Sequence, residues 1–236
     1  MPTKLKLSPL LPFVLLLSAC EIDLGRRGPT KTEPVAVELG KTEMARVELR
    51  MKVGEMKLTG GASKLIEGDL RYTDPEKPVV RSDSSGFRTT VSIDQPTRGH
   101  TSSRGDNYSW DLRLNPEVPL DLQLDFGVGQ GKLNLGDLNL RTLDVHMGVG
   151  QLNVDLRGTP KHDYSVTIHG GVGQATVLFP AGAGIVADAH GGIGSIQVRG
   201  LEKDNGRYIN SAYGHSKVTI RADVTGGIGE VRLIAE

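Results

Sequence analysis

Apolar and polar residues alternate along most of the chain from residue 35 to the end. The segments Leu122–Phe126, Leu143–Met147 and Tyr164–Ile168 show the pattern. Because successive side chains of a strand point to opposite faces, this period of two predicts β-strands that bury one face. Each of these segments leads into Gly-Val-Gly, and the alternation resumes after it.

The Gly-x-Gly motif, with Val or Ile at x, recurs at a nearly constant spacing. Its first glycines lie at 127, 148, 171, 192 and 227, so the intervals are 21, 23, 21 and 35 residues, and the last equals one period of 21 plus an insertion of 14. Such a repeat is typical of solenoids, and glycine suits a corner stacked closely between rungs. We therefore predict an all-β fold, a single-stranded parallel β-helix or solenoid of about 21-residue rungs with Gly-x-Gly corners.

Aligning the repeats predicts columns of core residues. One column is Leu133, Val154, Val177, Val198 and Leu233, and another is Phe126, Met147, Gly170, Gly191 and Gly226. The second column falls from large side chains to none, so we expect the coil to tighten toward the C-terminus.

The inserted residues Leu201–Tyr208 are predicted to form an outward loop. The last strand, Val231–Ile234, is predicted to be the exposed end of the solenoid.

The first 20 residues have the pattern of a bacterial lipoprotein signal peptide. Lys4 and Lys6 precede an apolar run that is too short to span a membrane, and small residues follow it. The sequence Leu-Ser-Ala-Cys at 17–20 resembles a lipobox, and Cys20 is the only cysteine of the chain. We therefore predict lipid attachment at Cys20 and location in the cell envelope. Glu21 follows the cysteine where an aspartate would indicate inner-membrane retention, which favours the outer membrane or the periplasmic face.

Changes in composition divide the chain into five parts. We predict a signal peptide at 1–19, a polar tether at 20–34, a strand-rich module at 35–94, a mobile Ser-, Thr- and Gly-rich loop at 95–109 and the solenoid at 110–236. The 28 basic residues balance the 28 acidic ones. Without a basic excess the chain lacks the electrostatics of a nucleic-acid binder.

Two parts of the chain resemble the bacterial toast-rack family, which is related to the C-terminal domains of LiaF-like envelope-stress proteins. Residues 38–72 are similar to the N-terminal toast-rack module, and Asn115–Leu122 with the Gly-Val-Gly rungs is similar to the solenoid that follows it. The resemblance covers about residues 36–236. It implies a β-helix in the cell envelope with a role in sensing, scaffolding or binding, and without established catalysis. A lipid anchor here takes the place of the membrane helices that LiaF-like proteins usually carry.

Three histidines occupy the same position of the repeat: His146, His169 and His190. Alternation turns this column outward, and Asp144 and Asp188 lie two residues earlier in their rungs. Neighbouring rungs are about 4.8 Å apart, so these five side chains could converge on a zinc ion. An exposed ladder of stacked, metal-free histidines is the alternative. No other cofactor is expected.

No motif in the sequence identifies an activity. Asp144, Asp188 and Asp223 could form a carboxylate group of the kind found in polysaccharide-degrading β-helix enzymes, but no nucleophile or substrate-stacking aromatic residue accompanies them. We therefore predict a non-catalytic, lipid-anchored envelope protein that binds an envelope protein or a polysaccharide, with a possible role in envelope-stress sensing. The alternatives are a metal-sensing lipoprotein and a carbohydrate-active enzyme.

Overall fold

The computed structural model describes residues 28–96 and 108–236. The predicted signal peptide, Cys20 and most of the predicted mobile loop lie outside these residues. The described part is all-β, and none of it forms a helix long and apolar enough to cross a membrane. It contains one sheet of 13 strands. The strands are β1 (Thr30–Val37), β2 (Met44–Gly60), β3 (Ile66–Thr73), β4 (Val79–Ser85), β5 (Arg88–Asp94), β6 (Ser109–Leu114), β7 (Leu120–Asn134), β8 (Leu140–Asp155), β9 (Tyr164–Phe179), β10 (Gly184–Arg199), β11 (Glu202–Asp204), β12 (Arg207–Ile209) and β13 (Thr219–Ala235).

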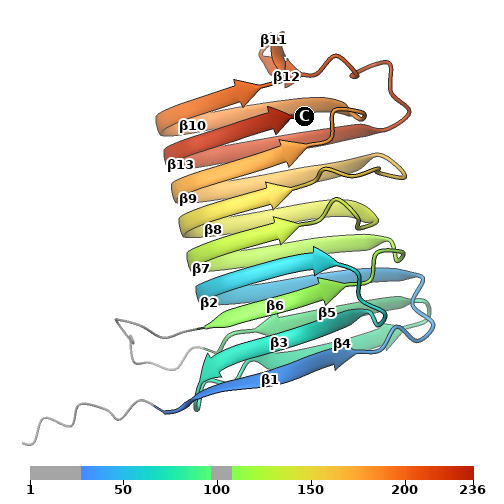
Figure 1. Ribbon diagram of the computed structural model, residues 1–236, viewed down its shortest axis with the longest axis vertical. Helices are drawn as coiled ribbons and strands as arrows, with labels where there is room; N and C mark the ends of the chain where they lie inside the picture. Colours follow the sequence, from blue (N-terminus) through green and yellow to red (C-terminus); the bar gives the residue numbers. More distant parts are fainter. Residues whose placement is uncertain (1–27, 97–107) are drawn as a thin grey trace, which may run out of the picture.

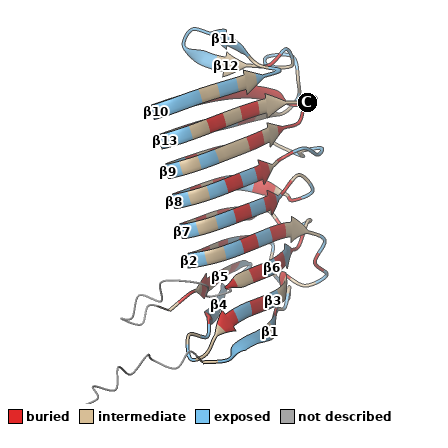
Figure 2. Ribbon diagram, turned by 60° about the vertical axis from the view of Figure 1, so that its left-hand side comes forward, coloured by how far each residue is buried: buried red, intermediate tan, exposed pale blue. Residues whose placement is uncertain are grey.

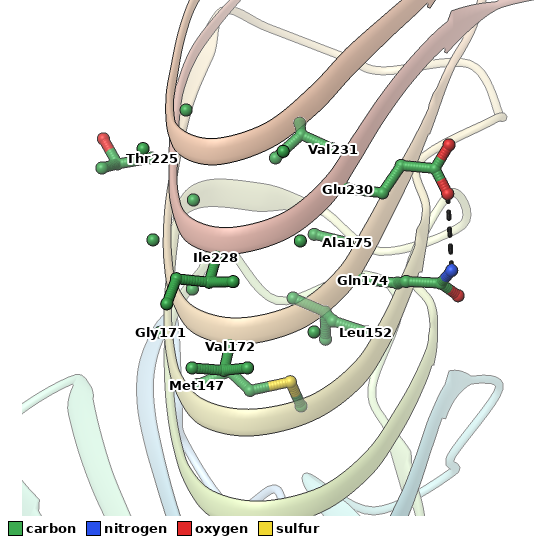
Figure 3. Close-up of a pocket in the computed structure, with 18 of the residues that line it drawn as sticks. Met147, Leu152, Gly171, Val172, Gln174, Ala175, Thr225, Ile228, Glu230 and Val231 are labelled. Atoms are coloured by element: carbon green, nitrogen blue, oxygen red, sulfur yellow. Dashed lines mark hydrogen bonds between the residues drawn. The ribbon is translucent and has the colours of Figure 1, made fainter.

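Six long strands form a stack of parallel rungs in the order β2, β7, β8, β9, β13, β10 (Figure 1). Their register aligns the Gly-x-Gly motifs of five rungs with Lys52-Val53-Gly54 of β2, and the rungs bend where the motif lies (Figure 3). Gly129 has φ of 149°, and a Cβ there would lie 1.8 Å from the carbonyl oxygen of Gly54 on the rung below. Only glycine can occupy such a position, because both the backbone conformation and the close approach of the neighbouring rung exclude a side chain.

The last strand is not the end of the stack. Strand β13 lies between β9 and β10 and pairs in parallel with both. The inserted residues expected to form an outward loop instead make strands β11 and β12, and β12 pairs with Val186 and Ala187 of β10. The carboxylate of Asp163 holds the start of β13 beside β9, accepting a hydrogen bond of 2.8 Å from the backbone N–H of Thr219 and one of 3.2 Å from Arg221. The end of the solenoid is therefore β10, partly covered by the β11–β12 hairpin.

The sheet divides at the other end of the stack. The first half of β2 pairs with β5, which pairs with β4, and the second half pairs with β6, which leads through β3 to β1. The predicted module at 35–94 and the predicted solenoid therefore share one sheet, since β2 also pairs with β7. Residues 30–34, predicted as tether, form the start of β1 because β3 offers them an edge to pair with.

The core lies between the two halves of each rung, where inward residues form aliphatic columns (Figure 2). The column Val47, Leu122, Leu143, Val166, Ala222 and Ala187 is buried on every rung. At the corner, Met51, Phe126 and Met147 fill the lower rungs, whereas Gly170, Gly226 and Gly191 leave the upper corner without side chains. A cavity of about 30 Å³ remains there, lined by Met147, Leu152, Ala175 and Val231 among others (Figure 3). The missing side chains thus leave a hollow in the upper corner.

Candidate binding surface at the solenoid corner

The residue at the centre of the corner motif is aliphatic and exposed on every rung; it lies between two glycines on five rungs and between Lys52 and Gly54 on β2. The register places these side chains in one column, which we call the corner ridge: Val53, Val128, Val149, Val172, Ile228 and Ile193. Their exposed fractions are 45–52% on the first five rungs and 73% for Ile193 on the terminal rung. A contiguous exposed apolar column is uncommon on a soluble surface and indicates a contact site.

Outward columns on both sides of the corner ridge are largely polar but uncharged in the middle of the stack. One column consists of Glu55, Gln130, Gln151, Gln174, Glu230 and Ser195, and the other of Arg50, Asp125, His146, His169, Thr225 and His190. The charged members are paired in part: Arg50 lies 3.6 Å from Asp125, and Glu230 lies 2.6 Å from Arg232. On β8 and β9 neither flanking column has a Lys, Arg, Asp or Glu residue.

A shallow groove of about 770 Å³ runs beside the corner ridge along the histidine column. Its floor includes Gly127, Gly148 and Gly171, the first glycines of three motifs. These residues carry no side chain, so the surface is hollowed there, and His146 and His169 line the groove. The glycine repeat therefore produces both the bend and the recess beside it.

The structure brings two of the three predicted histidine ligands together. The rings of His146 and His169 stack with centroids 5.1 Å apart, and His146 Nε2 lies 3.1 Å from Asp144 Oδ1. That oxygen is buried and accepts no hydrogen bond from any described residue, so the close approach does not form a hydrogen bond.

His190 and Asp188 do not join this group. Strand β13 inserts Thr225 between His169 and His190, and Asp188 lies 3.4 Å from Arg207 of β12. In residues 28–96 and 108–236 no group of three His, Cys, Asp or Glu side chains could hold a metal ion. The predicted five-residue zinc site is thus not assembled, because the strand order differs from the chain order that placed the histidines side by side.

The carboxylates considered for catalysis are also rearranged. Asp188 and Asp223 are register neighbours on β10 and β13, whereas Thr167 of β9 separates Asp144 from Asp223. Tyr164 is buried, and burial raises its pKa, so the phenol stays neutral and unavailable as a base.

The corner ridge, which the sequence analysis does not single out, is a more continuous feature than the histidine cluster or the carboxylate cluster. Its signal in the sequence is the invariable Val or Ile at the centre of each motif.

The fold and surface define a β-solenoid with a ladder-like exterior suited to binding. The family model for the N-terminal domain of toast_rack, DUF2154, matches residues 26–178. The chain belongs to the toast-rack family. It is also 31% identical to a crystal structure of a "putative cell adhesion protein" from Clostridium sporogenes, with a TM-score of 0.85, covering 88% of this chain and 100% of that one.

A second solved structure, described as a "putative adhesin" from Parabacteroides merdae, is 12% identical with a TM-score of 0.28, covering 89% of this chain and 97% of that one. At that TM-score it does not bear on function. No curated protein matches the chain.

Proposed function

We propose that this protein is a non-catalytic binding protein of the cell envelope, anchored by lipid at Cys20 and acting in adhesion. The observation that carries the proposal is the similarity to the Clostridium sporogenes protein over that protein's entire length. A shared rung architecture presents outward side chains in columns at the same spacing, and extended surfaces of this kind are what solenoids use for binding. The partner would be an envelope protein or a polysaccharide. In its more specific form, the proposal is that binding of this partner senses envelope stress.

Several features of the described residues support a binding role over a catalytic one. Asp188 is neutralised by Arg207, and Asp163 is engaged with Thr219 and Arg221. Asp144 lies beside the stacked histidines, and the hydroxyl of Thr167, its register partner, makes no side-chain hydrogen bond within the described residues that could activate it as a nucleophile. These acidic groups make contacts within the solenoid, whereas the corner ridge is exposed and can contact other molecules.

The test uses cells that produce the full chain and cells that produce its Cys20→Ser variant. We expect mass spectrometry to find acyl chains on Cys20 of the wild type, and we expect only those cells to gain adhesion to immobilised envelope polysaccharide or to partner cells. The physical reason is that stable membrane anchoring requires two or more membrane signals, since a single acyl chain binds only reversibly. A variant without the cysteine carries no acyl chain and should not stay on the cell surface.

Cells carrying Ser18→Thr, which keeps the cysteine, serve as the matched control and are expected to behave as wild type. A wild-type protein without acyl chains would contradict the anchor. Release of reducing ends from the polysaccharide by the purified full-length protein would instead support the carbohydrate-active alternative.

A further inference from the structure

The corner ridge is long enough to act as a continuous contact line. Its six side chains span five strand spacings of about 4.8 Å, or roughly 24 Å. All six remain at least 45% exposed, and Ile193 at the end is the most exposed large hydrophobic residue among those described. Any of these positions would accept a polar β-branched residue such as threonine without loss of strand geometry, so the aliphatic choice on every rung is not required by the fold.

The surroundings of the ridge would tolerate an apolar partner. On β8 and β9 the flanking residues are Gln151 and Gln174 on one side and His146 and His169 on the other. Covering this part of the ridge therefore removes no Lys, Arg, Asp or Glu side chain from water, which would otherwise oppose contact with an apolar phase. Glutamine and histidine can keep their hydrogen bonds in a polar interfacial layer beside it.

The chain enters the solenoid at the same edge as the ridge. The register runs from Thr32 of β1 to Arg71, to Ser109 and to Glu55, which is two residues beyond Val53. The start of β1 thus lies level with the corner, three strand spacings or roughly 14 Å from the first ridge residue. Figure 1 shows β1 beginning on the side where the rungs bend, while the turns that connect the rungs lie on the opposite side.

We propose that the corner ridge rests on the lipid leaflet that holds the Cys20 acyl chains. This inference rests on the proposed function, because the anchor supplies the membrane. The eight residue steps from Cys20 to Gly28 span at most about 26–29 Å, so the anchor keeps the corner edge close to the bilayer. The solenoid axis then lies along the membrane, the aliphatic side chains enter the interfacial layer, and the connecting turns face away from the bilayer toward a partner.

The experiment places a probe on the ridge of the full-length, lipidated protein. Cys20 is the only cysteine and its sulfur is consumed by lipid attachment, so a cysteine introduced by Val149→Cys is the only reactive thiol. The matched control is Asn153→Cys, an exposed position on the same strand. Each variant is labelled with an environment-sensitive fluorophore and reconstituted into phosphatidylcholine vesicles with or without bromine on the acyl chains.

We expect bromine quenching at position 149 to be at least about twofold stronger than at 153, because interfacial apolar faces lie about 5–10 Å into the headgroup and acyl boundary. The emission at 149 should also shift to the blue. Val128→Cys, one rung below, should give the same result, which guards against a local effect of one substitution. Circular dichroism establishes that each variant is folded.

Equal access of aqueous iodide to positions 149 and 153, with no bromine quenching at either, would overturn the proposal. Protection of position 149 from both quenchers, together with disulfide-linked dimers of the unlabelled variant, would overturn it in favour of a second copy on the ridge. Failure of the proposed function gives a different result: the protein would carry no acyl chain on Cys20 and would not float with the vesicles.

Discussion

The lower three rungs, β2, β7 and β8, and the upper three, β9, β13 and β10, share one exterior but differ inside. Both halves align their Gly-x-Gly motifs and continue the corner ridge. Inside the corner, the lower half is filled by Met51, Phe126 and Met147, each at most 6% exposed, whereas glycines take these positions in the upper half, beside a hollow of about 30 Å³. The lower half also stacks in chain order, and the upper half does not.

This difference shows which interactions set the shape of a rung. Hydrogen bonds between parallel strands fix the spacing of the rungs, and the glycine contacts fix the bend, so both persist when the core side chains vanish. The interior therefore contributes stability and not geometry. Loss of core volume at the corner leaves a hollow with its energetic cost.

The largest expected effect is common to both halves. In Gly173→Ala the new Cβ would lie 1.8 Å from the carbonyl oxygen of Gly150, at φ of 137°. We expect the free energy of unfolding to fall by roughly 3 kcal/mol or more, because a side chain cannot adopt this conformation and the rung below cannot move away. Chemical denaturation monitored by circular dichroism measures the loss.

Gly129→Ala in the lower half is the matched variant, since its Cβ would meet Gly54 at the same 1.8 Å. The two losses should agree, although one rung has a filled corner and the other does not. A much smaller loss in the upper half would mean that the hollow allows the rung to relax. It would contradict the claim that the glycine contacts constrain both halves equally.

Much of the fold could be predicted from local pattern. The strands, the parallel stacking and the inward columns follow from alternation and repeat length, because both are properties of each rung alone. The order of the upper rungs could not be predicted in this way, since β10 and β13 carry the same repeat and either could pair with β9. The choice depends on contacts distant in sequence, such as Asp163 with Thr219 and Arg221. For the same reason, chain order predicts His190 beside His169, whereas Thr225 of β13 lies between them.

A medium effect is expected at the contact that holds β13 in this unusual order. Asp163→Ala removes the acceptor for Thr219 and the ion pair with Arg221, and should lower the free energy of unfolding by about 0.5–1 kcal/mol, the low end for partly exposed hydrogen bonds. The hydrogen bond from Thr219 and the pairing with Arg221 lower the pKa of Asp163. This contribution is therefore full above the ordinary aspartate pKa of about 3.9 and is lost as pH falls through the lower folded value.

Denaturation at a series of pH values measures the difference between wild type and Asp163→Ala, which should shrink toward zero at acidic pH. Asp137→Ala is the control. Asp137 is an exposed carboxylate in the turn between β7 and β8, and no hydrogen bond or ion pair from the described residues reaches it. It should change stability little at any pH. An equal, pH-independent loss in both variants would show that Asp163 does not hold the upper rungs through its charge.

The only gain in stability is expected from partly filling the upper corner. Gly170 aligns with Met147 on the rung below, and a Cβ there would meet only the carbonyl oxygen of Thr225, at 3.7 Å. Gly170→Ala should raise the free energy of unfolding by about 0.5–1 kcal/mol, because alanine reduces the freedom of the unfolded chain and places a methyl group in an apolar hollow.

Gly226→Ala, on the next rung of the same column, distinguishes the effect of filling the hollow from the effect of replacing a glycine on the unfolded chain. Its Cβ would lie 2.9 Å from Cγ2 of Val231, so the same entropic gain would be offset by crowding, and its midpoint of denaturation should lie below that of Gly170→Ala. If Gly170→Ala were the less stable of the two, the upper corner would already be closed. The two halves of the solenoid would then differ in side-chain size alone, and not in how fully their interiors are packed.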